Sequence, residues 1–168
     1  MHELRAEGSG FATSAPKILR FAAVVAAPRE RVWASITDPA IVAPCVPGCQ
    51  GVEVVSPTVY RAQVRVQLGP IKAQFAVEVT LVSETPPEEV RSRTRGDERS
   101  LASTLSADNV LRLRALGAAE TEVYYASEVA VVGKLGKFGL GVMQKKAASL
   151  GRDFAAAFKE RVEAVAVP

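Results

Sequence analysis

Apolar and polar residues alternate along most of the middle of the chain. In residues 60–68 every second position is apolar: Tyr60, Ala62, Val64, Val66 and Leu68. A period of two is typical of a strand with one buried face. The alternation returns over residues 71–81, 90–96, 101–115 and 121–132, with no long helical pattern between these segments. Short turns such as Gly69-Pro70 must therefore join the strands, and we predict an antiparallel meander.

The two ends of this region have a different character. Residues 17–26 form an apolar run that predicts a first strand. Pro28 and Pro39 each stand where a short helix can begin, and Asp38 can cap the second one, which Pro44 would end. From about residue 134 to residue 165 the apolar residues keep helical phase: Leu135, Phe138, Val142, Leu150, Phe154, Phe158 and Val162.

These elements predict an α+β fold in which a curved antiparallel sheet of about seven strands grips one long C-terminal helix, with two short helices after the first strand. The inward rows carry many small side chains: Ala62, Ala73, Ser92, Thr94, Gly96, Ser103, Ala107 and Ser127. A curved sheet lined in this way can leave a cavity for a small molecule under the helix. The alternative is that aromatic residues fill the space: Phe75, Tyr125, Phe138, Phe154 and Phe158.

Length and composition fit one ordinary globular domain. Of the 168 residues, 48% are hydrophobic and 23% are charged, and we expect a domain over residues 17–168 after a mobile tail at residues 1–16. The net charge of +3 is too small to indicate a nucleic-acid partner. No apolar run reaches the roughly 20 residues of a membrane span, and no secretory signal is recognised. We therefore expect a cytoplasmic protein.

Few residues in the chain suit catalytic or metal chemistry. The only histidine is His2, in the tail, so histidine-based triads lack their base. Cys45 and Cys49 stand around a Val-Pro-Gly corner and would supply two of the four ligands of a structural zinc site. Their spacing also differs from the C-x-x-C of thiol redox proteins. We interpret both as packing thiols and expect no metal and no cofactor.

Residues 133–141, GKLGKFGLG, are rich in glycine where the long helix is predicted to start. The spacing matches neither a P-loop nor a dinucleotide fingerprint, so we expect these glycines to bring the helix close to the sheet or to form a portal. Lysines follow without an intervening acid: Lys134, Lys137, Lys145 and Lys146. Such a patch either contacts an anionic membrane or an acidic partner, or is a solvated face.

Three segments of the chain carry a family resemblance: residues 28–49, PRERVWASITDPAIVAPCVPGC; residues 66–75, VQLGPIKAQF; and residues 129–139, VAVVGKLGKFG. In this order they are similar to the opening, with its aliphatic-Pro-Gly corner, the Gly-Pro hairpin and the start of the last helix of the CoxG family. Its members are the accessory G subunits of carbon monoxide dehydrogenases. Longer members continue into an apolar membrane-binding tail. This sequence ends at Pro168, so we expect any membrane contact to be reversible.

The resemblance implies the helix-grip fold of the START-like (SRPBCC) superfamily. It also implies a non-catalytic accessory protein of a molybdenum-containing carbon monoxide dehydrogenase or related hydroxylase, which aids membrane association or electron transfer. An apolar molecule, a quinone or a lipid, would occupy a cavity lined by Val64, Val66, Phe75, Val77, Tyr125, Ser127, Phe138, Val142 and Phe154. The mouth of the cavity would be bordered by Val46, Pro47, Gly48, Gly136 and Gly139.

An enzymatic alternative stays open, because the superfamily includes polyketide cyclases and dehydratases. The candidate polar residues would then be Tyr125, Ser103 and Thr94. Carboxylates such as Glu78 and Glu122 fall on the outward phase of their strands, and we expect no inward carboxylate to transfer a proton.

A second alternative is a pure assembly factor. Arg91, Arg93 and Arg95 alternate along one predicted strand and would face outward together. Such a row could dock on an acidic partner without any internal ligand.

Overall fold

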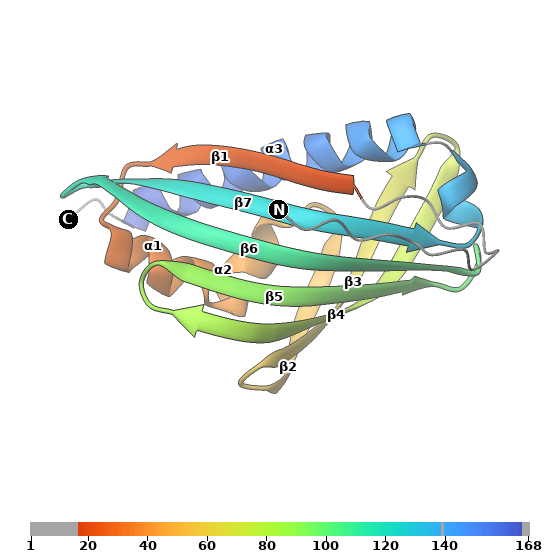
Figure 1. Ribbon diagram of the computed structural model, residues 1–168, viewed down its shortest axis with the longest axis horizontal. Helices are drawn as coiled ribbons and strands as arrows, with labels where there is room; N and C mark the ends of the chain where they lie inside the picture. The colour runs from red at the N-terminus through yellow and green to blue at the C-terminus, as the bar shows by residue number, and fades with distance from the viewer. Residues whose placement is uncertain (1–16, 139, 166–168) are drawn as a thin grey trace.

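A single antiparallel sheet curves around the terminal helix (Figure 1). The computed structural model describes residues 17–138 and 140–165; the predicted tail at residues 1–16 lies outside them. The strands are β1 (Lys17–Val25), β2 (Cys49–Ser56), β3 (Val59–Leu68), β4 (Ile71–Thr85), β5 (Glu89–Glu98), β6 (Ser103–Gly117) and β7 (Glu120–Val132). They are hydrogen-bonded in the order β1-β7-β6-β5-β4-β3-β2. The fold class is therefore confirmed.

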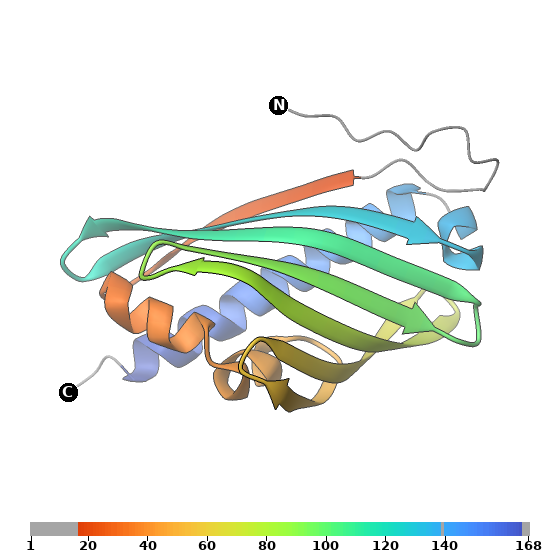
Figure 2. The same cartoon turned by 60° about the horizontal axis from the view of Figure 1, so that its bottom comes forward.

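The helices lie on the concave face of the sheet (Figure 2). They are α1 (Arg29–Ile36), α2 (Pro39–Val42), η1 (Ala43–Cys45), η2 (Lys134–Phe138) and α3 (Leu140–Val165). Asp38 caps α2 as predicted, because its Oδ1 accepts the backbone N–H of Ala40 at 2.9 Å. The helix α2 ends at Val42, before Pro44, as predicted. Pro44 lies in the first turn of η1, where a missing N–H costs no hydrogen bond.

The alternation in the sequence matches the two faces of the sheet. On the concave face, Val77 of β4 lies between Ala62 of β3 and Gly96 of β5. On the outward face, Arg61 pairs with Glu78 at 2.9 Å. The strands therefore turn most of their apolar and small residues towards the helices and most of their charges towards solvent.

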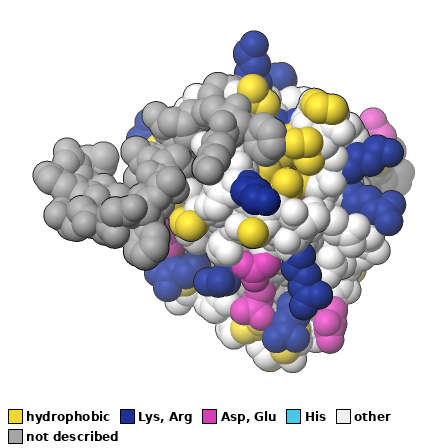
Figure 3. Space-filling model, turned by 90° about the vertical axis from the view of Figure 1, so that its right-hand side faces the viewer, with side chains coloured by type: hydrophobic (Ala, Val, Ile, Leu, Met, Phe, Trp, Pro, Cys, Tyr) yellow, Lys and Arg dark blue, Asp and Glu magenta, His cyan; other side chains and the backbone are white. Residues whose placement is uncertain are grey.

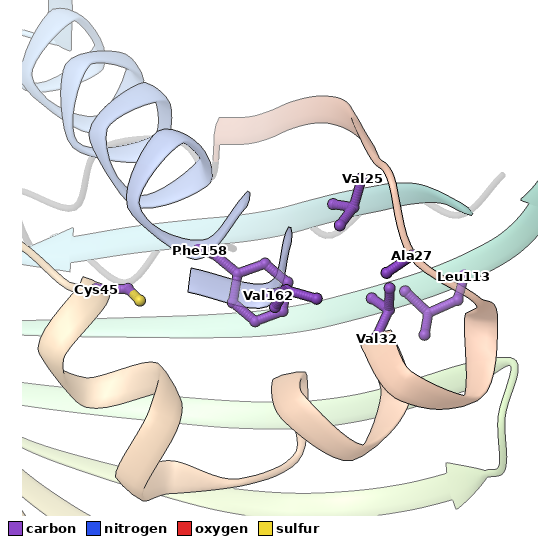
Figure 4. Packing of buried hydrophobic residues seen from close by; sticks show 7 residues of the cluster. All are labelled: Val25, Ala27, Val32, Cys45, Leu113, Phe158 and Val162. Atoms are coloured by element: carbon purple, nitrogen blue, oxygen red, sulfur yellow. The ribbon is translucent and has the colours of Figure 1, made fainter. Parts of the chain in front are cut away.

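The buried core is divided into two clusters at opposite ends of the sheet. The first lies where α1 meets the end of α3 (Figure 4) and consists of Val25, Ala27, Val32, Cys45, Leu113, Phe158 and Val162. The second lies at the other end, around the β3–β4 turn and η2, and consists of Leu68, Ala73, Phe75, Val131 and Leu135. Between the clusters, several concave-face residues are only half-buried: Ala62, Val64, Val77, Val79, Ser92 and Thr94. We call these six residues the concave middle.

The terminal helix starts later than the sequence predicted. The apolar pattern indicates a helix from about residue 134, but η2 precedes α3. Leu135, 0% exposed, donates its backbone N–H to Ser103 Oγ at 2.9 Å. Gly133 has φ +106, and a Cβ at this position would lie 2.2 Å from the carbonyl oxygen of Ala102. Only glycine permits this backbone approach, which turns the chain before the regular helix can begin.

Farther along, α3 is fixed to the edge strand β1. A Cβ at Gly151 would lie 3.0 Å from Cε1 of Phe21, so the helix backbone lies close against that ring. Near its end, Glu163 Oε2 accepts the backbone N–H of Ala26 at 2.8 Å. The helix also approaches β3. It therefore reaches across the concave face, with its middle against β1 and its last turns fixed by the hydrogen bond with Ala26.

One inward carboxylate contradicts the prediction that the inward rows carry none. Glu98, 4% exposed, follows Gly96 on the inward phase of β5. Its carboxylate accepts the backbone N–H of Gln74 and, at 2.7 Å, both the backbone N–H and the hydroxyl of Ser100. These hydrogen bonds, led by that from the Ser100 hydroxyl, lower the pKa of Glu98. The carboxylate therefore holds the β5–β6 turn together through these hydrogen bonds.

We expect Gly133→Ala to lower the free energy of unfolding by about 2–4 kcal/mol, since it adds backbone strain and a steric clash. Urea unfolding would measure the loss. Gly117→Ala is the matched control, because nothing lies within 4 Å of a Cβ built there. Similar unfolding midpoints for the two variants would contradict the proposed constraint on the start of the last helix.

Candidate functional site

A cluster of polar side chains lies between the two core clusters, on the floor of the concave face. At its centre is Asn109 of β6, which is 7% exposed. Its Oδ1 accepts the hydroxyls of Tyr125 at 2.9 Å and Ser127 at 2.7 Å. Its Nδ2 donates to Ser92 Oγ at 3.2 Å and Thr94 Oγ1 at 3.0 Å. We call these five residues the polar cluster.

The strand register explains why these side chains meet. Asn109 lies directly between Ser92 of β5 and Ser127 of β7. Thr94 and Tyr125 are on the same face, two residues along their strands from those partners. Sequence analysis had placed Ser92, Thr94, Tyr125 and Ser127 on the inward rows but missed Asn109. Its phase with Ala107 and Leu113, both buried, is the signal that could have identified it.

Tyr125 connects the polar cluster to the terminal helix. Its ring stacks on Phe21 with centroids 5.0 Å apart, and Phe21 in turn contacts Gly151 of α3. Burial raises the pKa of Tyr125, and a hydrogen bond with Ser127 offsets the rise in part. The phenol therefore stays protonated at neutral pH and serves as a hydrogen-bond donor.

The residues predicted to line the cavity lie at different depths. Val64, Val66 and Val77 are half-buried on the concave face, and Val66 and Val77 pack against the second core cluster. Phe75 is instead buried in the second core cluster. Phe154 packs against the first cluster and stacks on Phe158, with ring centroids 5.8 Å apart.

The residues around the start of α3 that were predicted to line the cavity or its mouth differ in their exposure. Val142 is 51% exposed. Gly136 lies in η2, and a Cβ built on it would have only the carbonyl oxygen of Val131 within 4 Å, at a distance of 3.7 Å. Gly139 and the side chains of Lys137 and Phe138 lie outside the described part of the chain.

The predicted mouth residues Val46 and Pro47 are half-buried beside Gly48, which is tied to β3. Gly48 has φ +82, its carbonyl accepts the N–H of Arg65 at 2.9 Å, and a Cβ there would lie 2.0 Å from the Arg65 carbonyl oxygen.

The two cysteines flank this corner as free thiols. Cys45 is buried in the first core cluster, and burial raises the pKa of its thiol. Its Sγ donates to the Ile41 carbonyl at 3.4 Å, and the Sγ of Cys49 donates to the Gly51 carbonyl at 3.5 Å. Within the described residues, no group of three or more His, Cys, Asp or Glu side chains could hold a metal ion.

A small pocket of about 290 Å³ lies between the β3–β4 turn and the first turns of α3. Its lining combines Val142 with two predicted lysines, and consists of Gln67, Leu68, Gly69, Val142, Lys145, Lys146 and Ser149. Lys134 is also exposed. Figure 3 shows this end of the molecule, where hydrophobic side chains gather among lysines and arginines. No helix in the described ranges is long and apolar enough to cross a bilayer.

The outward arginines have partners within the sheet. Arg91 pairs with Glu89 at 3.3 Å, Arg93 with Asp108 at 2.9 Å, and Arg95 with Asp97 at 3.6 Å. A second pocket of about 560 Å³, lined mainly by outward-facing residues of β5, β6 and β7, contains two further arginine–glutamate pairs. The charges of these pairs are therefore nearly balanced: five arginines meet four acids, because Arg91 and Arg112 share Glu89.

The chain matches the family model for the G subunit of carbon monoxide dehydrogenase (CoxG) over residues 22–163. No curated protein matches it.

Several solved structures share the fold at low sequence identity. A conserved protein from Geobacillus kaustophilus superposes with a TM-score of 0.81 at 20% identity, covering 88% of this chain and 95% of that chain. A START superfamily protein from Mycobacterium smegmatis gives 0.69 at 17% identity, covering 88% and 98%. The Zhui aromatase/cyclase from Streptomyces sp. R1128 gives 0.65 at 15% identity, covering 88% and 94%. These similarities confirm the START-like fold.

We expect Tyr125→Phe to lower the free energy of unfolding by about 1 kcal/mol at neutral pH, because the ring remains and only the donor to Asn109 is lost. The raised pKa of Tyr125 stabilises the folded state below about pH 10, and this contribution is lost as the pH rises through the folded-state value. The difference between wild type and variant should therefore shrink in alkali.

Denaturant unfolding at several pH values would measure that difference. Tyr60→Phe is the control at neutral pH, because the Tyr60 hydroxyl makes only a long, exposed contact of 3.4 Å with the Pro57 carbonyl. Equal losses in the two variants would contradict a special role for the Tyr125 hydroxyl.

Proposed function

Because the chain belongs to the CoxG family of carbon monoxide dehydrogenase, we propose that it is a non-catalytic accessory protein of a molybdenum-containing carbon monoxide dehydrogenase or a related hydroxylase. In this proposal it holds an apolar small molecule, a quinone or a lipid, between the sheet and α3. By carrying that molecule, the protein would aid membrane association or electron transfer. The family match over residues 22–163 supports the accessory role.

The division of the core supports the ligand-binding part of the proposal. Fully buried apolar residues concentrate at the two ends of the sheet, while the concave middle keeps accessible surface under a helix that spans it. Interiors are normally close-packed, so the accessible surface that these valines keep favours an apolar occupant. Its burial would contribute about 25 cal/mol per Å² before the costs of binding.

Two polar residues that a cyclase could use already make hydrogen bonds within the protein. Ser103 accepts the N–H of Leu135 and donates its hydroxyl to the Leu101 carbonyl at 2.8 Å. Glu98 closes the β5–β6 turn. Their engagement favours a binding role for the concave face over proton transfer.

The lysine-lined pocket supports a reversible membrane contact. Lys145 and Lys146 flank Val142, whose half-exposed side chain could enter the headgroup region while the ammonium groups meet anionic lipids. The same end of the molecule contains the start of α3, beside the space proposed for the ligand. The balanced charge of the arginine row gives less support to docking on an acidic partner.

Val64→Asp should abolish retention of the apolar molecule, because it places a charge on the concave middle. The protein would be purified after incubation with native membranes, and bound molecules would be identified by native and organic-extraction mass spectrometry. Gln63→Asp adds the same charge on the outward face of β3 and should retain the ligand. Equal retention in both folded variants would contradict the proposed location.

Charge reversal at Lys145 and Lys146 should weaken binding to phosphatidylglycerol vesicles by at least about tenfold, since each lysine near an anionic surface contributes about 1 kcal/mol. Vesicle sedimentation at low and high salt would measure the loss. Arg152→Glu with Arg161→Glu is the control, because it changes the net charge equally on later turns of α3. Similar losses in both double variants would indicate non-specific attraction.

A further inference from the structure

We propose that the polar cluster is a hydrogen-bonding subsite for a carbonyl oxygen of the bound apolar molecule, with Ser92 and Thr94 as the donors. This inference rests on the proposed function, because it concerns the same space under α3. It adds a chemical requirement: the molecule must carry an uncharged acceptor oxygen and cannot be a plain hydrocarbon.

The argument begins with the hydrogen-bonding capacity of Asn109. A carboxamide has two N–H donors and an oxygen that accepts two hydrogen bonds, and the four hydroxyls around Asn109 use all four positions. A hydroxyl can donate or accept. Whichever way the amide is oriented, two of the four hydroxyls must accept its N–H groups, and these two keep their own hydrogens unused.

In the structure, the two hydroxyls that accept from Asn109 are those of Ser92 and Thr94. Across the described part of the chain, neither hydroxyl hydrogen has a protein acceptor within hydrogen-bonding distance. Both residues are half-buried members of the concave middle, whereas Ser127, which also belongs to the polar cluster, is fully buried. The unused donors therefore belong to the residues that keep accessible surface.

The surroundings determine the chemical class of the acceptor. Thr94 lies beside Val79 and Ser92 beside Leu81 in the β4–β5 register, so the apolar body of the ligand would rest on β4. The polar cluster contains no charged side chain, and the phenol of Tyr125 stays neutral. A carboxylate or phosphate would be buried there without a counter-charge, at a high cost. A carbonyl oxygen matches two neutral donors and leaves no hydrogen of its own unpaired.

The polar cluster should make the site reject molecules that lack the oxygen. A site built to hydrogen-bond its ligand discriminates strongly against an apolar analogue, because the protein donors are then left buried without partners. The test uses two probes of similar shape: 2,3-dimethyl-1,4-naphthoquinone, which has carbonyl groups and no free quinone ring position for a thiol to attack, and 2,3-dimethylnaphthalene, which has no carbonyl group.

We would titrate each probe into the ¹⁵N-labelled full chain and follow two-dimensional NMR spectra. Wild type should bind the quinone probe about tenfold more tightly than the hydrocarbon. The side-chain amide signal of Asn109, assigned by its loss in Asn109→Leu, should shift with the quinone probe and stay unchanged with the hydrocarbon. This comparison needs no variant other than the one used for assignment.

The double variant Ser92→Ala with Thr94→Val removes both donors while keeping the shape of the side chains. It should bind the two probes with similar affinity. Ser106→Ala with Thr80→Val makes the same chemical changes on the outward faces of β6 and β4 and should keep the tenfold preference. Should the first double variant fail to fold, the wild-type preference and the Asn109 signal still decide the question.

The outcomes separate this inference from the proposed function. Equal binding of both probes by wild type, with no shift of the Asn109 signal, would overturn the subsite and leave the ligand-binding function standing. Failure of wild type to bind either probe would count against both. A preference that persists unchanged in the Ser92→Ala, Thr94→Val variant would show that these two hydroxyls are not the donors and would overturn the proposal.

Discussion

The attachment of α3 to the two ends of the sheet is the constraint on which the rest of the structure depends. At one end Leu135 of η2, the short helix that leads into α3, is fully buried and donates its backbone N–H to Ser103, and at the other end Phe158 and Val162 of α3 enter the first core cluster. Hydrophobic burial scales with the apolar area removed from water, wherever that area lies. The helix can therefore obtain its stability at its ends and cross the middle of the sheet without filling it. The concave middle follows from this geometry.

The polar cluster is hard to explain by stability alone. Asn109 satisfies all of its hydrogen-bonding groups, which offsets the cost of burying an amide. Replacement of a complete polar set by apolar groups of the same shape is often close to neutral, so folding does not demand such a set here. An apolar surface at this place would have no hydrogen-bond donors held in a fixed orientation. This difference supports the proposed part of the buried amide in recognition.

Local patterns in the sequence predict most of the fold. The period-two rows identify which residues of β3 and β4 face inward, and Asp38 with Pro39 marks the start of α2. Asn109 and Glu98 could not be placed in the same way, because their roles depend on partners from neighbouring strands. The late start of α3 depends on a backbone approach between Gly133 and Ala102, which lie far apart in the sequence. Likewise, Phe75 follows the same inward pattern as Val77, and only the tertiary packing separates the core residue from the half-buried one.

The separation of the two core clusters from the concave middle also bears on how such a protein can change over generations. Substitutions at Val64, Val79 or Thr94 alter the shape and polarity of the space under α3 but leave both clusters intact. Most random substitutions are eliminated because they unfold a protein, and this arrangement removes much of that penalty from the residues of the concave middle. Descendants can therefore change the surface of the concave middle by small steps, each of which keeps the fold.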